Sequence, residues 1–156
     1  KRVVQAMVTA HPYEEVAYDL YDLAMPWSSV GSGLWGQLSK PMNTEDFLTL
    51  LKEKLNVSCI RHTALVKNQI ETVALCGGSG SFLLNAAKSV KADVFVTADF
   101  KYHQFFDAED DIIIADVGHY ESEQFTPNLL SRFLKEKHSD LNCVITEVNT
   151  NPVKYF

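Results

Sequence analysis

The pattern of apolar and polar positions divides this chain into short segments that predict strands and helices in turn. At the start, Val3–Val8 alternates as a strand does. The next segment, "HPYEEVAYDLYDL" (11–23), indicates a helix, with Pro12 near its first position and acidic residues in its first turn. Together the two segments predict one βα unit.

A segment with no helical period follows this unit. Ala24–Gly36 is rich in Gly, Ser and Pro, which is typical of a linker or a long loop. We therefore predict two domains, at residues 1–30 and 31–156. The start of the second domain contains "WGQLS" (35–39), which indicates a short strand.

The clearest helix signal lies at residues 43–56. Asn43 or Thr44 is suited to cap this helix, acidic residues occupy its first turn, and lysines lie near its end. Its apolar positions recur on one face: Phe47, Leu48, Leu51 and Leu55.

Strands and helices are predicted to alternate through the rest of the chain. Residues 59–66 and 71–76 indicate neighbouring strands joined by a turn at 67–70. Beyond them, helices are expected at 81–90 and 101–109, and a long helix that begins near Tyr120 is expected to include 124–138. Strands are expected at 92–97, 111–116 and 142–148. Continuous apolar strands between helices of this length predict an α/β fold, with a mainly parallel sheet covered on both faces.

Composition narrows the class of protein. Apolar residues make up 46% and charged residues 22% of the 156, and no apolar run approaches the roughly 18 residues that span a bilayer. We therefore expect a cytoplasmic protein without a membrane partner. A net charge of -6 argues against nucleic acid and favours a small ligand or another protein chain. Cys59, Cys76 and Cys143 are expected to be buried and reduced.

In open parallel sheets, ligands bind beyond the carboxyl ends of the strands. Three junctions between a predicted strand and the following helix are therefore candidate binding sites. The first is glycine-rich, with Gly77, Gly78, Ser79 and Gly80 ahead of a helix. Glycines allow close backbone approach and a helix start attracts anions, so these residues are candidates for substrate binding. The alternative is a tight turn with a serine cap.

The second junction carries Asp99 and His103 shortly after an apolar strand. Both are candidates for acid, base or substrate-contacting residues. Alternatively, Asp99 caps the next helix and His103 lies on its solvated side.

The third junction places Gly118 before His119, with Glu123 four residues further on. Four-residue spacing brings the imidazole and the carboxylate to one helix face, where both could bind one divalent ion, and Gly118 would supply the bend. The alternative is that His119 caps the helix, while Glu121 and Glu123 complement its dipole.

Three motifs in order, "VALCGGSGSFL", "ADVFVTADFKYHQFFDA" and "ADVGHYESEQF", resemble the carboxyl-terminal part of the NIF-three-like family. Its members are metal-binding proteins often catalogued as homologues of a type-two GTP cyclohydrolase I. The resemblance extends over residues 31–156 and implies a three-layer αβα domain. Upstream, residues 3–23 resemble the end of the ferredoxin-like, PII-like domain that some members carry as an insert.

The resemblance implies two divalent ions, with His119 and Glu123 as the matching ligands. The family's other ligands are a His-His pair and an Asp in the amino-terminal half. This chain has no such pair, so we expect a carboxyl-terminal fragment with part of the ligand set. His11 belongs to the insert and is not counted as a ligand. Zn, Mn, Fe and Mg are all compatible with these two donors.

Two functions follow from the resemblance as expectations. One is a dinuclear metal-dependent hydrolase of a nucleotide or pterin-like small molecule, with Gly77–Gly80, Asp99 and His103 facing the substrate. The alternative is a non-catalytic, metal-stabilised ring protein with a ligand-sensing or regulatory role. The resemblance also implies a homo-oligomer, the toroidal hexamer of the family.

Overall fold

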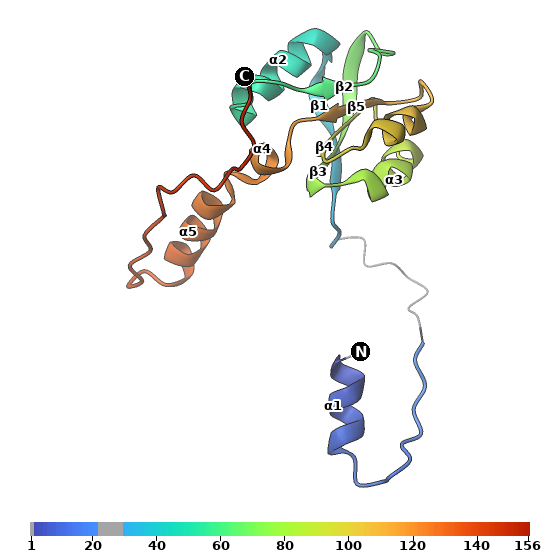
Figure 1. The fold of residues 1–156 in the computed structure, drawn as a ribbon, viewed down its shortest axis with the longest axis vertical. Coiled ribbons are helices and arrows are strands. Elements are labelled where there is room, and N and C mark those ends of the chain that lie inside the picture. Colours follow the sequence, from blue (N-terminus) through green and yellow to red (C-terminus); the bar gives the residue numbers. More distant parts are fainter. Residues whose placement is uncertain (1, 22–29) are drawn as a thin grey trace. The chain divides into compact units, whose positions relative to one another are not determined.

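The computed structural model describes residues 2–21 and 30–156 and divides the chain into two compact units, Lys1–Gly31 and Ser32–Phe156 (Figure 1). Residues 24–29 of the predicted linker, Ala24–Gly36, lie outside the described residues. The first unit contains one helix, α1 (Arg2–Ala10).

Both secondary-structure predictions for the first unit are wrong. The expected strand Val3–Val8 lies within α1, and residues 11–21 form neither helix nor strand. Val4 and Val8 are the half-buried positions of α1, and they stand four residues apart. That spacing fits one helix face, so the apolar pattern of this short segment was compatible with both periods.

The second unit is built on a five-stranded sheet with the order β1-β3-β4-β5-β2. Its strands are β1 (Leu34–Asn43), β2 (Arg61–His62), β3 (Gln69–Ser79), β4 (Val94–Ala98) and β5 (Ile113–Asp116). The three central strands are parallel, whereas β1 and β2 run antiparallel to β3 and β5 at the two edges. The sheet is therefore mixed, which corrects the expectation of a mainly parallel one.

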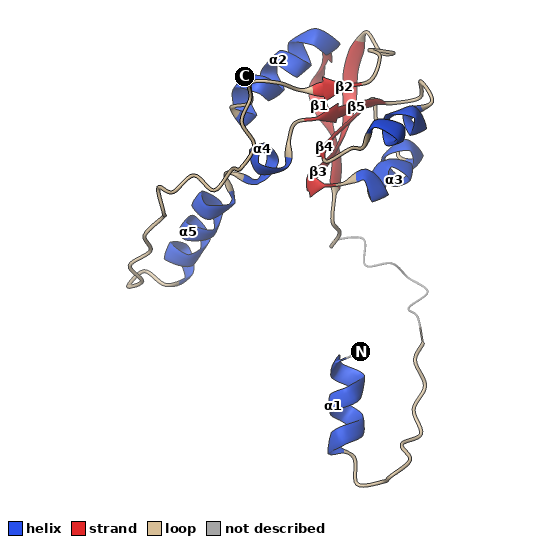
Figure 2. Cartoon of the chain, in the orientation of Figure 1, coloured by secondary structure: helices blue, strands red, loops and turns tan. Residues whose placement is uncertain are grey.

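Helices cover both faces of this sheet (Figure 2). On one face α2 (Thr44–Leu55) packs through Phe47 against side chains that include Val94, Val96 and Ile113. The other face carries the 3₁₀ helices η1 (Ser81–Leu83) and η2 (Tyr102–Ala108) together with α3 (Leu84–Ser89). Its core contains Phe95, Phe100 and Ile114. Successive residues of a strand thus pack on opposite faces of the sheet, because their side chains alternate in direction.

The predicted helix at 43–56 is confirmed as α2. The side chain of Asn43 accepts hydrogen bonds from the backbone amides of Glu45 (2.9 Å) and Asp46 (3.4 Å). Asn43 is therefore the cap, and Thr44 is the first helical residue. At the other end, Asn56 takes a left-handed conformation that stops the helix.

Three further expectations are wrong. Residues 59–66 do not pair with β3, because the two-residue strand β2 pairs with β5 instead. The long helix expected to begin near Tyr120 and to include residues 124–138 is divided into α4 (His119–Glu123) and α5 (Thr126–Lys137), and Pro127 occupies the first turn of α5. Residues 142–148 form no strand and pair with none of the five strands of the sheet.

All three cysteines are free, as expected, but only Cys76 is buried. Cys59 is exposed and Cys143 is half-buried. Both belong to segments predicted to be strands, but neither residue lies in a strand of the sheet. Their apolar neighbours therefore do not place them in the core.

Candidate metal-binding site

The parallel register of the central strands brings the three predicted junctions together. Ser79 at the end of β3 pairs with Ala98 at the end of β4, and Thr97 of β4 pairs with Asp116 at the end of β5. Residues that follow these strand ends therefore share one edge of the sheet. This is the edge where ligands bind in open α/β sheets.

His119 lies at the centre of this edge. The chain leaves β5, turns at Gly118 with φ +93°, and starts α4 at His119. The Nε2 atom of His119 lies 3.4 Å from Oε2 of Glu123, and its Nδ1 atom lies 2.6 Å from Oδ2 of Asp99. The hydrogen bond to Asp99, reinforced by the charges of Asp99 and Glu123, raises the pKa of His119 above its ordinary value.

This geometry speaks against the simpler interpretations of the junction residues. Gly118 is the N-cap of α4 and no side chain caps that helix, so His119 does not act as a cap. Asp99 does not cap a helix either, because η2 begins after Lys101. Instead, the His119 side chain contacts both Asp99 and Glu123, and all three side chains are about half exposed.

Gly78 stands directly beside the pair formed by His119 and Glu123. Its φ is +62°, and a Cβ atom at this position would lie 2.6 Å from Oε1 of Glu123 and 3.1 Å from Nε2 of His119. The amide of Gly78 donates a hydrogen bond to Oγ of Ser122 at 2.8 Å, and its carbonyl accepts one from the buried hydroxyl of Thr97 at 3.2 Å. Only glycine leaves room for both side chains here.

The rest of the glycine-rich run is less involved. Gly77 is next to Glu123, whose Cγ would lie 3.7 Å from a Cβ atom at that position. Gly77, Gly78 and Ser79 belong to β3 and do not form a loop, while Gly80 lies against Thr97 and Cys76 in the interior. The glycine that meets the candidate metal ligands most closely is therefore Gly78.

His103 stands apart from the other predicted residues. It is exposed on η2, and its ring packs edge-to-face on Tyr102 with 5.1 Å between the ring centroids. It does not line the cleft that borders His119. Among the residues that the structure describes, nothing connects His103 to the pair.

A cleft of about 1220 Å³ borders this site. Residues from β2, the ends of β4 and β5, α4, α5 and the carboxyl-terminal segment line it, including Arg61, Asp99, His119, Glu123, Asn151 and Tyr155. A cavity of this size accommodates a small organic molecule. His119 and Glu123 thus border a space large enough for a ligand.

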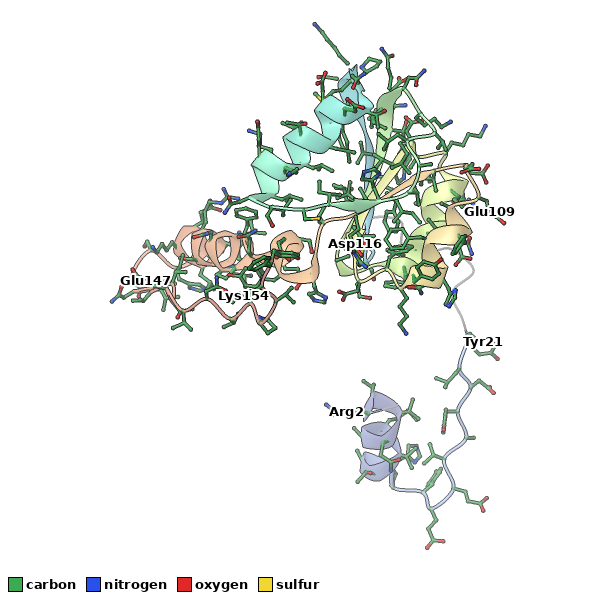
Figure 3. All side chains as sticks on the ribbon, turned by 45° about the horizontal axis from the view of Figure 1, so that its top comes forward. Arg2, Tyr21, Glu109, Asp116, Glu147 and Lys154 are labelled. Atoms are coloured by element: carbon green, nitrogen blue, oxygen red, sulfur yellow. The ribbon has the colours of Figure 1, made fainter. Side chains whose placement is uncertain are left out.

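Two buried carboxylates lie near the site: Asp116 was not singled out from the sequence, and Glu121 was considered only as a partner of the helix dipole. Asp116, labelled in Figure 3, is 3% exposed and accepts hydrogen bonds from the amides of Phe100 (2.9 Å) and Gly118 (3.1 Å), as well as from Arg61. Glu121 is 8% exposed and accepts one from Nδ2 of Asn151 at 3.1 Å. An acidic residue that closes a fully apolar strand was the available signal for Asp116.

The donor atoms fit part of a metal shell. An imidazole nitrogen and a carboxylate oxygen are suitable ligands for divalent ions, and His119 Nε2 and Glu123 Oε2 face one another across 3.4 Å. Within residues 2–21 and 30–156, no group of three or more His, Cys, Asp or Glu side chains could hold an ion. The described residues therefore bring two suitable donor atoms together, and other groups would have to complete a metal shell.

Comparisons with known proteins agree on one family. The family model Duf34/NIF3 (NGG1p interacting factor 3) matches residues 3–152. The chain is 33% identical to a Bacillus subtilis protein and 37% identical to one from Halalkalibacterium halodurans, both named GTP cyclohydrolase 1 type 2 homolog. The alignments cover 99% of this chain but only 43% and 42% of those relatives. The chain thus spans less than half of their length.

Solved structures show the same similarity. A Bacillus cereus protein related to NIF3 matches with a TM-score of 0.71 at 34% identity, over 99% of this chain and 44% of that one. A Staphylococcus aureus protein matches with a TM-score of 0.71 at 28% identity, over 99% of this chain and 52% of its own. In the described part of the chain, no helix has the length and apolar character needed to cross a membrane.

Proposed function

Because the chain belongs to the Duf34/NIF3 family, we propose that it is the part of a divalent-metal-binding protein that supplies His119 and Glu123 as ligands. The observation that carries this proposal is the approach of His119 Nε2 to Glu123 Oε2 at 3.4 Å. The absence of a side chain at Gly78, directly beside both atoms, supports it. Zn, Mn, Fe and Mg are all candidate ions for these two donors.

The proposed activity is hydrolysis of a nucleotide or pterin-like small molecule by a site with two divalent ions. When bound, such ions lower the pKa of a water molecule and stabilise the charge that develops on the reacting oxygen. In this proposal His119 and Glu123 bind a divalent ion, and α4 holds both side chains on one helix face. The adjoining cleft of about 1220 Å³ supports a small-molecule substrate, and the names of the bacterial relatives suggest its class.

Metal binding is tested by calorimetric titration of the full-length protein with each of the four ions. We expect His119→Ala and Glu123→Ala each to weaken binding at least about tenfold, which corresponds to about 1.4 kcal/mol. His138→Ala and Glu136→Ala are matched controls, because both side chains are exposed near the end of α5 and do not line the cleft. Unchanged affinity in both site variants would remove the proposed ligands.

A non-catalytic function is the second candidate, and one observation favours it. Asp99 is engaged by His119, His103 lies away from the cleft, and Glu121 is buried against Asn151. Of the two residues considered as an acid or base, Asp99 is thus hydrogen-bonded to His119 and His103 does not line the cleft. A ring protein that uses metal for stability would need no such group.

Turnover separates the two candidates. Full-length protein loaded with each ion is screened against nucleotides and pterins, and hydrolysis that disappears in His119→Ala favours the enzyme.

A homo-oligomeric ring, with six subunits in the family that the motifs resemble, is proposed for both candidates. The exposed Leu129, Leu130 and Phe133 on α5 support burial in an assembly. A cytoplasmic location is proposed on composition alone.

A further inference from the structure

Asp99 and His119 form the closest side-chain contact at the candidate metal site. Oδ2 of Asp99 lies 2.6 Å from Nδ1 of His119. An ionised carboxylate can only accept a hydrogen bond, so the proton lies on Nδ1 in neutral His119. The lone pair of Nε2 is then free, and this is the nitrogen that faces Glu123 and Gly78.

The backbone holds Asp99 in place for this contact. Asp99 has φ +59°, a left-handed conformation that costs a non-glycine residue energy and that aspartate tolerates better than most. Its neighbours Ala98 and Phe100 are 0% and 2% exposed. The amide of Phe100 also donates to the buried Asp116 at 2.9 Å. Asp99 is therefore fixed between two anchored residues.

The side chain of Asp99 has no other role in the described part of the chain. It caps no helix, and the hydrogen bond to His119 is the only one it forms there. A strained backbone between buried neighbours, presenting one carboxylate to one imidazole nitrogen, is typical of a residue that orients a ligand.

We propose that Asp99 is a positioning residue for the metal site. It keeps His119 in the Nδ1–H tautomer and turns Nε2 toward Glu123, and it does not itself bind the ion. The inference rests on the proposed metal function and adds to it, because it assigns to Asp99 a role that is neither catalytic nor ligating.

The test uses the full-length protein and two measurements. Affinity for Zn²⁺ is measured by calorimetry, and the tautomer of His119 is measured by nitrogen-15 NMR of the metal-free protein at a pH where its imidazole is neutral. We expect wild type to show the Nδ1–H tautomer. Asp99→Ala should lose this preference and bind Zn²⁺ about 10- to 100-fold more weakly. Asp99→Asn, whose amide oxygen can still accept a hydrogen bond from Nδ1, should retain part of the tautomer preference and part of the Zn²⁺ affinity.

Asp110→Ala is the matched control. Asp110 is also an exposed aspartate with a left-handed backbone, φ +58°, and it does not line the cleft beside His119. It therefore reproduces the strain that alanine introduces without touching His119. Equal Zn²⁺ affinity in Asp99→Ala and Asp110→Ala would overturn the proposal, and so would an Nε2–H tautomer in wild type.

One further outcome is informative about both proposals. If His119→Ala and Glu123→Ala lose metal while Asp99→Ala keeps it, the positioning role is wrong and the metal function stands. If neither His119→Ala nor Glu123→Ala loses metal, the metal function fails, and the role of Asp99 fails with it.

Discussion

The amide of Gly78 donates a hydrogen bond to the hydroxyl of Ser122 at 2.8 Å, which ties the end of β3 to α4. The same hydroxyl donates to the carbonyl of His119 at 2.8 Å. Ser122 thus connects the strand to the first residue of the helix. Consequently, a displacement of the backbone at Gly78 would also displace His119, because both residues are hydrogen-bonded to Ser122.

Replacing Gly78 by alanine should impair both stability and metal binding. Any side chain at this position would be strained, because φ is left-handed at +62° and a Cβ atom would lie only 2.6 Å from Oε1 of Glu123. We expect a loss of about 1–2 kcal/mol in the free energy of unfolding and about tenfold in divalent-metal affinity. Gly36→Ala is the control, because a Cβ atom there meets nothing within 4 Å. Equal behaviour of the two variants in denaturant titration and calorimetry would refute the prediction.

Removing the carboxylate of Asp116 should destabilise the fold. The amides of Phe100 and Gly118 would lose their acceptor, and Arg61 would lose its partner. We expect Asp116→Ala to cost about 3 kcal/mol in urea-induced unfolding. Asp140→Ala, an exposed aspartate beyond α5, should change stability by less than about 0.5 kcal/mol. A cost for Asp116→Ala as small as that of the control would contradict the hydrogen-bond account.

The three thiols should react at very different rates with a neutral alkylating reagent. Cys59 is exposed and Cys143 half-buried, whereas Cys76 is buried and its burial raises the pKa of the thiol. Because the thiolate is the reactive species, native protein should be labelled at Cys59 first, then at Cys143, and last at Cys76. Mass spectrometry of peptides from timed samples gives the order. Early labelling of Cys76 would show that its environment is open.

Tyr155 should ionise at a higher pH than an ordinary tyrosine. Partial burial, followed by the nearby charge of Glu121, raises its pKa above the usual value of 10.0. A raised pKa favours the protonated folded state, so this contribution to stability is present below pH 10 and is lost as the pH rises through the pKa in the folded state. The difference in near-ultraviolet titration between wild type and Tyr155→Phe isolates it from the other five of the six tyrosines. An ordinary pKa in that difference curve would disprove the prediction.

The helix and strands that carry the site were predictable because their signals are local. Val94–Ala98 and Ile113–Asp116 are short apolar runs, and the contact between His119 and Glu123 follows from their four-residue spacing. The contact between Asp99 and His119 was not predictable, since twenty residues separate them and it depends on the register of two parallel strands.

The errors have equally physical origins. Apolar residues at Val4 and Val8 satisfy a helix face as well as a strand, and five or six residues are too few to separate the two periods. Residues 142–148 carry the composition of a strand, but strand formation depends on pairing with a distant segment, which sequence alone does not reveal. The expectation that Cys59 is buried is wrong for a similar reason. The strand predicted at 59–66 is only two residues long in the structure and does not include Cys59, which is exposed.

The nine residues of α1 include no buried side chain, and this has a consequence for the first unit. An isolated helix shorter than about 12 residues is marginal in water, whatever its composition. A synthetic peptide of residues 2–21 should therefore be largely random coil by circular dichroism and become helical only in a helix-promoting cosolvent. The shape of this segment is conditional on its surroundings, whereas residues 32–156 carry the apolar interior that sustains their own.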